Sequence, residues 1–392
     1  MTTLKTLIQW IGNGLFMLLV FLFVADPTNT ILGLKSHVFA LLLLYNLVFF
    51  KADWSKIIYI LIPVACVLVS FIFATMQGSH VDMGALKDLL LSFAPLVLLL
   101  WAGHYDMVRL SVAPVVVAAI VVLALFWTVC FMPELEGLIY NYMGKHNDTI
   151  MMSNRVILGF RIFCMYPKST VAFLPVFGYL VYKSMTRSKN RIWNILLMLV
   201  LLHMFVISGT RSSVLFPVLL VGVMVFVYCR NGRYLRYVVY PAVAAFVVLF
   251  FAVLAMLLLE TDEPSNLVKY AHLTSYKELF ETNPQYLLMG QGPCTEFYSM
   301  GFRKMTLQTE WTYVELIRNY GIMCLPILYV ILLPIYRLFR QAQRHDSALA
   351  IALAYIVYLI IAGTNPLLFS STGMLVLLSA YSYTERLKCS KE

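Results

Sequence analysis

The stretch VISGTRSSVLFP, residues 206–217, decides the fold because it places one arginine, Arg211, between two long apolar runs. A charged side chain is costly inside lipid. Small polar residues flank Arg211 on both sides, as in a short turn where a chain leaves and re-enters a membrane. The stretch therefore predicts two membrane spans joined by a turn, with Arg211 at the boundary between membrane and water.

The composition of the whole chain is that of a polytopic membrane protein. Its 392 residues are 61% hydrophobic and 12% charged, with a mean hydropathy of +0.83, whereas soluble domains carry about 25% charged residues. The net charge of +10 is typical of basic residues on cytoplasmic loops, so nucleic-acid binding is not expected. The first apolar run lacks a small-residue cleavage site, which predicts a retained span rather than a signal peptide.

About twelve apolar runs are long enough to cross a membrane as helices. They occupy residues 7–25, 30–50, 57–75, 86–102, 108–132, 169–185, 192–208, 212–229, 237–259, 312–336, 347–363 and 367–383. The second and fourth are the least secure, because they contain Lys35, His37, Lys87 and Asp88. With the N-terminus in the cytoplasm, alternation places most basic clusters on short inner segments, as the positive-inside rule requires. We therefore expect an all-α fold, residues 1–392 forming one transmembrane domain with both termini cytoplasmic.

Two long segments, residues 133–168 and 260–311, then lie on the outer face together with Arg211. Long loops in compact proteins are often functional. The second loop has apolar residues at roughly helical spacing between positions 268 and 280, which predicts an amphipathic helix on the membrane surface or an ordinary loop helix packed on the bundle. Gly290 and Gly292 follow it and predict a tight turn, with phosphate binding as the weaker alternative.

The outer face gathers several cations and one candidate general base. The cations are Arg155, Arg161, Arg211, Lys269 and Arg303. Arginine suits a diphosphate because its planar fork makes two hydrogen bonds to one phosphate, although cations at a membrane boundary also meet lipid headgroups. Glu310, beside Trp311 and Tyr313 at the mouth of a span, is a candidate base; a solvated glutamate at a helix start explains it equally well. Glu315 and Arg318, one helical turn apart, are interpreted as a structural pair.

Metal and cofactor chemistry is not expected. The sequence has no HExxH, Walker A or GxSxG motif and no aspartate pair spaced for magnesium. Cys164 and Cys294 fall in the two outer loops and pair if the compartment is oxidising; two separate thiols are the equal alternative.

Taken together, these features resemble the bacterial O-antigen polymerase (Wzy) and O-antigen ligase (WaaL) superfamily. The resemblance rests on the SGTRSS turn, the predicted helix that ends in NP before GQG, the TEWTYVELIRNYG segment and the late TNP turn. It implies a GT-C-like, inverting, metal-independent glycosyltransferase of the bacterial inner membrane, with a periplasmic active face. The implied substrate is an oligosaccharide on undecaprenyl diphosphate, and membrane lipid and a chain-length regulator protein are the implied partners.

The resemblance also implies roles for single residues. Arg211 matches the family's arginine in the turn after the seventh span, and either Arg155 or Arg161 matches its first-loop arginine. Lys269 stands where the family often has an arginine that opens the surface helix, so these four residues are expected to hold the diphosphate. Arg303, Trp311 and Tyr313 are expected to contact sugar.

Glu310 separates the two branches of the superfamily. Ligases typically carry a histidine about 11 residues before a glycine in the following span. In this sequence the residue 11 positions before Gly321 is Glu310. We therefore expect a polymerase of O-antigen, capsule or exopolysaccharide in which Glu310 is the catalytic base. The alternatives are an O-antigen ligase that uses lipid A core as acceptor, and a lipid-linked sugar flippase or other transporter.

Overall fold

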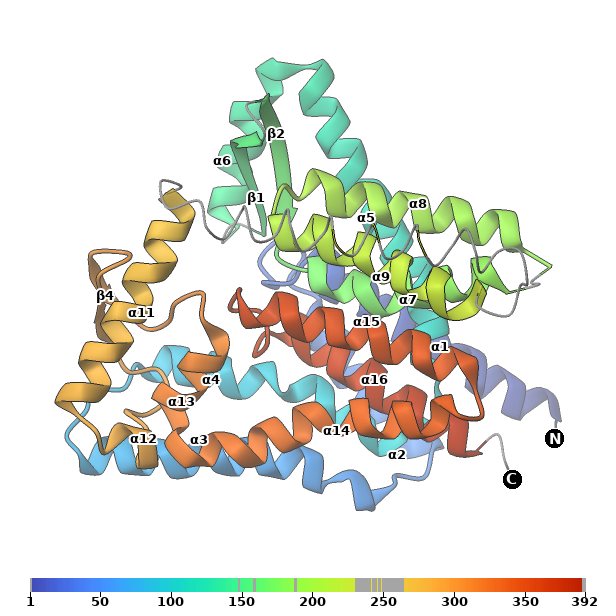
Figure 1. Ribbon diagram of the computed structural model, residues 1–392. Helices are drawn as coiled ribbons and strands as arrows, with labels where there is room; N and C mark the ends of the chain where they lie inside the picture. The colour runs from blue at the N-terminus through green and yellow to red at the C-terminus, as the bar shows by residue number, and fades with distance from the viewer. Residues whose placement is uncertain are drawn as a thin grey trace.

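The computed structural model shows a bundle of apolar helices (Figure 1). It describes residues 2–146, 149–157, 160–186, 189–229 and 264–389, with the isolated positions 241, 245 and 248. In this described part of the chain, seven helices are long and apolar enough to cross a membrane, and three shorter apolar helices accompany them. The prediction of a mostly helical polytopic membrane protein is confirmed. Twelve spans stay a prediction, because the ninth, residues 237–259, lies almost wholly outside the described residues.

Most of the helices coincide with predicted apolar runs, but the runs 86–102 and 312–336 are each interrupted, and α6, α11 and α12 lie in the two long loops. Those of the first half are α1 (Thr2–Ala25), α2 (Lys35–Phe49), η1 (Trp54–Lys56), α3 (Ile58–Met76), α4 (Met83–Ser92), η2 (Ala94–His104), α5 (Met107–Phe131), η3 (Pro133–Leu135), α6 (Glu136–Lys145), η4 (Thr170–Ala172), α7 (Phe173–Met185) and α8 (Arg191–Ile207). Those of the second half are α9 (Arg211–Cys229), α11 (Pro264–Thr282), α12 (Tyr286–Met289), α13 (Thr312–Tyr320), η5 (Gly321–Met323), α14 (Cys324–Ala342), α15 (Asp346–Gly363) and α16 (Ser371–Cys389).

Two antiparallel β-hairpins interrupt the helical pattern, and the sequence reasoning did not predict them. β1 (Ile150–Ile157) pairs with β2 (Phe160–Pro167) in the first long loop, and β3 (Phe297–Ser299) pairs with β4 (Lys304–Thr306) in the second. Both hairpins are short local pairings within a loop, so the 3.6-residue periodicity that identifies spans gives no sign of them. The fold is therefore helical in the bundle and mixed in the outer loops.

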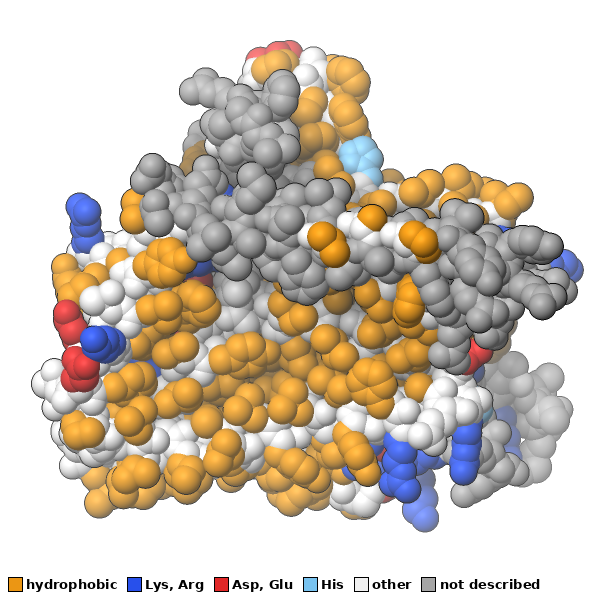
Figure 2. Space-filling view, viewed as in Figure 1, with side chains coloured by type: hydrophobic (Ala, Val, Ile, Leu, Met, Phe, Trp, Pro, Cys, Tyr) orange, Lys and Arg blue, Asp and Glu red, His pale blue; other side chains and the backbone are white. Residues whose placement is uncertain are grey.

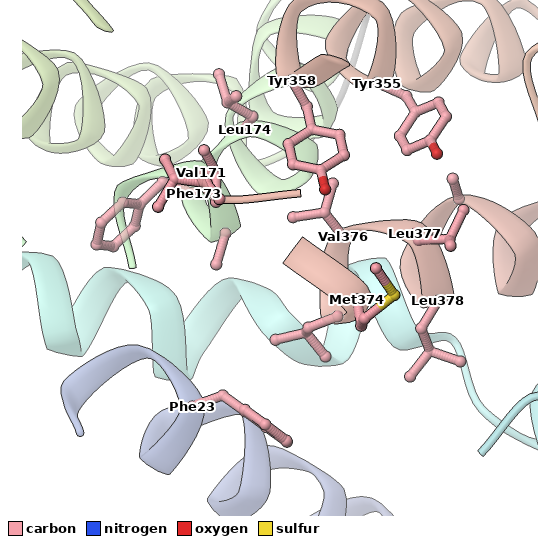
Figure 3. Close-up of a cluster of buried hydrophobic side chains, with 14 of the residues drawn as sticks. Phe23, Val171, Phe173, Leu174, Tyr355, Tyr358, Met374, Val376, Leu377 and Leu378 are labelled. Carbon is pink, nitrogen blue, oxygen red and sulfur yellow. The ribbon is translucent and has the colours of Figure 1, made fainter. Parts of the chain in front are cut away.

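Close packing of small residues fixes the centre of the bundle around α15. Gly178 of α7 lies so near α15 that a Cβ atom there would collide with the Cβ of Ala354, and small residues allow such close approach of membrane helices. Tyr355 and Tyr381 donate hydrogen bonds to the carbonyls of Ile331 (2.8 Å) and Val330 (2.6 Å) in α14. Figure 3 shows Tyr358 and Tyr355 above Val376, Leu377 and other residues of α16.

A broad apolar surface covers α3 and α14, and Figure 2 shows it as a hydrophobic belt across the lower part of the molecule. Exposed large hydrophobic residues on these helices include Leu61, Ile72, Leu325, Tyr329 and Leu332. An apolar area this continuous is unusual on a soluble monomer. It is the surface expected of helices that face lipid.

The start of α1 and the end of α16 lie at the same end of the bundle, which we call the inner end (Figure 1). Lys and Arg side chains gather there, at the lower right of Figure 2. Glu385 forms ion pairs with Lys56 (2.8 Å), Arg337 (3.4 Å) and Lys388 (2.9 Å). Segments that the charge pattern assigned to one side of a membrane therefore meet in space. That this end faces the cytoplasm stays a prediction.

Candidate functional site

The second long loop forms the opposite, outer end of the bundle, and one buried arginine holds it there. Arg318 of α13 has no exposed surface. Its Nε donates to Glu315 Oε2 (2.7 Å), Nη1 to Gln291 Oε1 (2.7 Å) and Nη2 to the Leu307 carbonyl (2.7 Å). The guanidinium also lies over the Phe297 ring, 4.4 Å from its centroid. Glu315 and Arg318 thus form the structural pair that their spacing indicated, and they organise the loop from residue 291 to 307.

The same network binds α11 to the bundle. The Tyr276 hydroxyl donates to Glu315 Oε1 (2.6 Å), which also accepts a hydrogen bond from the Thr309 amide (2.8 Å). Burial and the nearby Glu315 carboxylate raise the pKa of Tyr276 well above its usual value. His272, Ser275 and Tyr276 form the buried side of α11, so polar contacts rather than a simple apolar face attach this helix.

The glycines of the GQG turn allow close packing. Gly290 has φ +75°, and a Cβ atom there would collide with the backbone carbonyl of Asn319. Gly292 has φ +111° and lies against Ala74 of α3. The backbone amide of Gln291 donates to the Arg318 carbonyl at 2.6 Å. These contacts explain the glycines as an ordinary tight turn, with backbone conformations that favour glycine.

Glu310, the candidate base, lies two residues before α13 and is paired with Lys269. Glu310 Oε2 is 3.3 Å from Lys269 Nζ, and both side chains are about one-third exposed, at 37% and 30%. The Trp311 indole donates to the Lys269 carbonyl at 3.0 Å, which fixes this part of α11 against the start of α13. The structure therefore brings together Glu310, Lys269 and Trp311, which are far apart in the sequence.

Two other candidates, Tyr313 and Arg303, differ in whether their polar groups are already engaged. The Tyr313 hydroxyl donates to the Leu359 carbonyl at 2.8 Å, and its ring covers Gly363, so Tyr313 binds α13 to α15. Arg303 is an exposed residue in the turn between β3 and β4, with φ +55°. Arg303 is accessible to a ligand, whereas the Tyr313 hydroxyl is already engaged.

The remaining candidate arginines lie on other outer elements. Arg211 is the first residue of α9 and is partly buried. Arg155 is on β1 opposite Ile162, and Arg161 is on β2 opposite Val156; their side chains lie outside the described residues. β2 packs against α5 and α8, and α8 leads into the turn that carries Arg211. The hairpin and the turn that carries Arg211 thus form one arginine-bearing region of adjoining elements.

A cavity of about 770 Å³ opens at the outer end, within the ~300–1,000 Å³ range of ligand pockets. The turn after α1, the start of α2, α4, the segment 307–309, α13 and the turn before α16 enclose it. Its polar and charged lining includes Asn29, Lys35, Ser36, Asp88, Ser92, Gln308, Thr309, Thr312, Glu315, Asn319, Ser370 and Ser371. Phe23, Phe39 and Phe369 supply aromatic surface. Glu310 stands between two lining residues, Thr309 and Thr312.

Sequence reasoning missed this cavity although the signal was present. Lys35 and Asp88 appeared only as charges that weakened two predicted spans, yet ionisable residues in apolar runs commonly mark functional sites. Lys35 Nζ donates to the Pro27 carbonyl (2.5 Å) and lies 5.3 Å from the Phe23 ring centroid. Lys35 of α2 and Asp88 of α4 line the same cavity, which the sequence does not reveal.

Two titratable groups near the site have shifted pKa values. His272 is fully buried; its Nδ1 contacts Ser299 Oγ at 2.8 Å, and burial lowers its pKa despite nearby Glu310 and Glu315. Cys294 lines the cavity, and burial raises the pKa of its thiol to about 11. Within the described part of the chain, Cys164 and Cys294 are separate and no disulfide joins them.

Comparisons with known proteins add little to this geometry. No family model and no curated protein matches the sequence. One solved structure, from "Structural coordination of polymerization and crosslinking by a peptidoglycan synthase complex", has a TM-score of 0.45 and 16% sequence identity, covering 87% of this chain and 98% of that one. A likeness at this level carries no argument about function, which therefore rests on the site itself.

Proposed function

We propose that this protein is a membrane glycosyltransferase that polymerises a glycan carried on a lipid diphosphate. One observation carries the proposal: a partly exposed carboxylate, Glu310, lies in the chain between Thr309 and Thr312, which line a large polar cavity at the outer end of a lipid-facing bundle. The resemblance to O-antigen polymerases also supports the proposal, and it rests in part on the TEWTYVELIRNYG segment that contains Glu310. The acceptor is a sugar hydroxyl of a second lipid-linked repeat unit, and the active face is the periplasmic face of the inner membrane.

In the proposed reaction the acceptor oxygen attacks the anomeric carbon of the donor sugar. A new carbon–oxygen bond forms, the bond from the anomeric carbon to the diphosphate oxygen breaks, and the electron pair leaves with the lipid diphosphate. Glu310 takes the proton of the attacking hydroxyl, a role typically worth 10²–10⁴-fold in rate. Arg211, with Arg155 or Arg161, stabilises the charge that develops on the leaving diphosphate.

Lys269 has two roles in this scheme. Its Nζ lies 3.3 Å from Glu310 Oε2 and pairs with that carboxylate. A diphosphate that enters beside α11 attracts the same ammonium, because lysine is a compact point charge on a flexible stem. Transfer of Lys269 from Glu310 to the diphosphate would release the base when the donor is in place. Arg303 and Trp311 are the proposed sugar contacts at the exposed edge.

The test uses purified protein in lipid nanodiscs, supplied with the host's lipid-diphosphate repeat unit, and measures the ladder of polymer products. We expect Glu310→Gln to lower the rate by about 10²–10⁴-fold and Arg211→Ala by about 10²–10³-fold. Glu278→Gln, which changes an exposed carboxylate of α11, is the matched control and should keep the wild-type rate. Full polymerisation by both variants, with lost lipid translocation, would instead indicate a transporter.

Deletion in the host separates the polymerase from the ligase. Loss of a polymerase leaves single repeat units on lipid A core, whereas loss of a ligase leaves bare core and polymer on the carrier lipid. Labelling of single cysteines at positions 211 and 310 tests the geometry: the proposal fails if the two positions are reached from opposite sides of the membrane.

A further inference from the structure

The outer cavity differs in charge from the arginine-bearing region. Within the described lining, the ionisable groups that carry charge at neutral pH are Lys35, Asp88 and Glu315. Arg318 pairs with Glu315 at 2.7 Å and offsets its charge, so Lys35 and Asp88 leave the lining without net charge. A lining with no net positive charge gives a diphosphate little electrostatic stabilisation, so the cavity is a poor site for the leaving group.

Two of these three charges are already engaged by the protein. The Lys35 ammonium is held by the Pro27 carbonyl and lies 3.4 Å from Ser371 Oγ. Both oxygens of Glu315 accept hydrogen bonds, from Tyr276, Thr309 and Arg318. Neither group needs a ligand to satisfy it.

One charged group of the lining is not engaged by the protein. Among the described residues, no hydrogen bond or ion pair engages the exposed carboxylate of Asp88 on α4. An ionised carboxylate only accepts hydrogen bonds, so Asp88 suits a ligand that donates them. The cavity therefore favours a ligand that supplies several hydroxyl donors and no negative charge.

We propose that this cavity is the subsite for the acceptor sugar, in which Asp88 accepts hydrogen bonds from its hydroxyl groups. The inference rests on the proposed function for the identity of the ligand. Phe39 and Phe369 supply apolar surface for the ring faces, and Ser36, Ser92 and Gln308 supply further polar contacts. Thr309 and Thr312, which flank Glu310 in the sequence, are part of the wall.

Cys294 provides a native reporter, because it lines the same cavity. The experiment measures the rate of Cys294 alkylation by N-ethylmaleimide at pH 8.5, by peptide mass spectrometry of the full chain in nanodiscs. The probes are the repeat-unit oligosaccharide cut from the host polysaccharide, inorganic pyrophosphate, and undecaprenyl diphosphate without sugar. At a probe concentration ten times its Kd, mass action leaves about a tenth of the sites empty, so labelling should slow about tenfold.

We expect the oligosaccharide alone to protect Cys294. Asp88→Ala should raise the oligosaccharide concentration needed for protection by about tenfold or more, because it removes a hydrogen-bond acceptor. Lys87→Ala alters the exposed neighbour of Asp88 outside the lining and should leave it unchanged. Equal protection by pyrophosphate or by sugar-free lipid overturns the inference, and so does labelling that no probe slows.

The outcomes separate this inference from the proposed function. If the protein makes polymer but no probe protects Cys294, the proposed polymerase activity is retained and the proposed acceptor subsite is rejected. Protection by oligosaccharide in a protein that makes no polymer keeps a sugar site and removes the polymerase. In a polymerising protein, Asp88→Asn should raise the KM for the acceptor more than it lowers kcat, since it weakens binding without touching the base.

Discussion

Replacing Arg318 by methionine tests whether the outer end is built on one buried cation. The side chain is fully buried and donates to acceptors on Glu315, Gln291, Thr295 and Leu307. Methionine fills similar space but leaves the Glu315 carboxylate without its ionic partner. Removing one partner of a buried ion pair typically costs about 3–5 kcal/mol, against at most about 1 kcal/mol for an exposed pair.

The assay combines thermal unfolding in detergent with hydrogen exchange followed by mass spectrometry. We expect Arg318→Met to lower the free energy of unfolding by about 3–5 kcal/mol and to speed exchange between residues 285 and 310. Peptides from α15 should exchange as in the wild type, because the central packing does not involve this arginine. Arg340→Met, an exposed position on α14, is the matched control.

A double variant distinguishes the loss of the ion pair from a general failure to fold. Glu315→Gln with Arg318→Met removes both charges while the glutamine oxygen still accepts from Tyr276 and Thr309. Because the two residues are in contact, their effects should be non-additive by about 0.5–3 kcal/mol, and the double variant should be more stable than Arg318→Met alone. A single variant within about 0.5 kcal/mol of wild type, as for ordinary surface changes, would refute the reasoning.

Three further predictions follow from backbone strain and shifted pKa values. Gly290→Ala should destabilise the protein by about 1–3 kcal/mol, measured by thermal unfolding, because φ is +75° and the new Cβ collides with Asn319; Gly137→Ala, with open space around it, is the control. Burial lowers the pKa of His272, so the unfolded state binds its proton more readily. Stability should therefore be lost as the pH falls below about 6.5, and His272→Gln should flatten that part of the pH profile of the melting temperature. The pKa of Cys294 is raised to about 11 by burial and by the Asp82 carboxylate, so its alkylation rate should still increase with pH above 9, where an ordinary thiol of pKa about 8.5 is mostly thiolate; a plateau near pH 9 would contradict the buried position.

The bundle was predictable because lipid imposes a simple rule on sequence. A helix that crosses a membrane must be apolar over its length, and basic residues mark its inner end, so runs such as residues 108–132 and 347–363 could be read directly. The β1–β2 hairpin could not, since its strands pair within a loop that has no requirement for continuous hydrophobicity.

The candidate site was predictable only in its parts. Arg211, Lys269 and Glu310 were identified because charges beside apolar runs are unusual, and all of them lie on outer elements of the fold. The pairing of Lys269 with Glu310 depends on how α11 crosses the start of α13, which no local pattern specifies. Likewise, the cavity between α2, α4 and α13 is formed by tertiary packing, so Asp88 looked like a weakness in a span rather than part of a site.

The ion pairs of Glu385 distinguish the two ends of the bundle. They join α16 to η1 through Lys56 and to α14 through Arg337, at the end of the bundle farthest from the cavity. α14 continues from α13, whose Glu315 and Asn319 line the cavity, and α16 begins at the lining residue Ser371. These helices are therefore tied together by charge at one end, whereas at the other end a ligand in the cavity would contact both α13 and the first turn of α16.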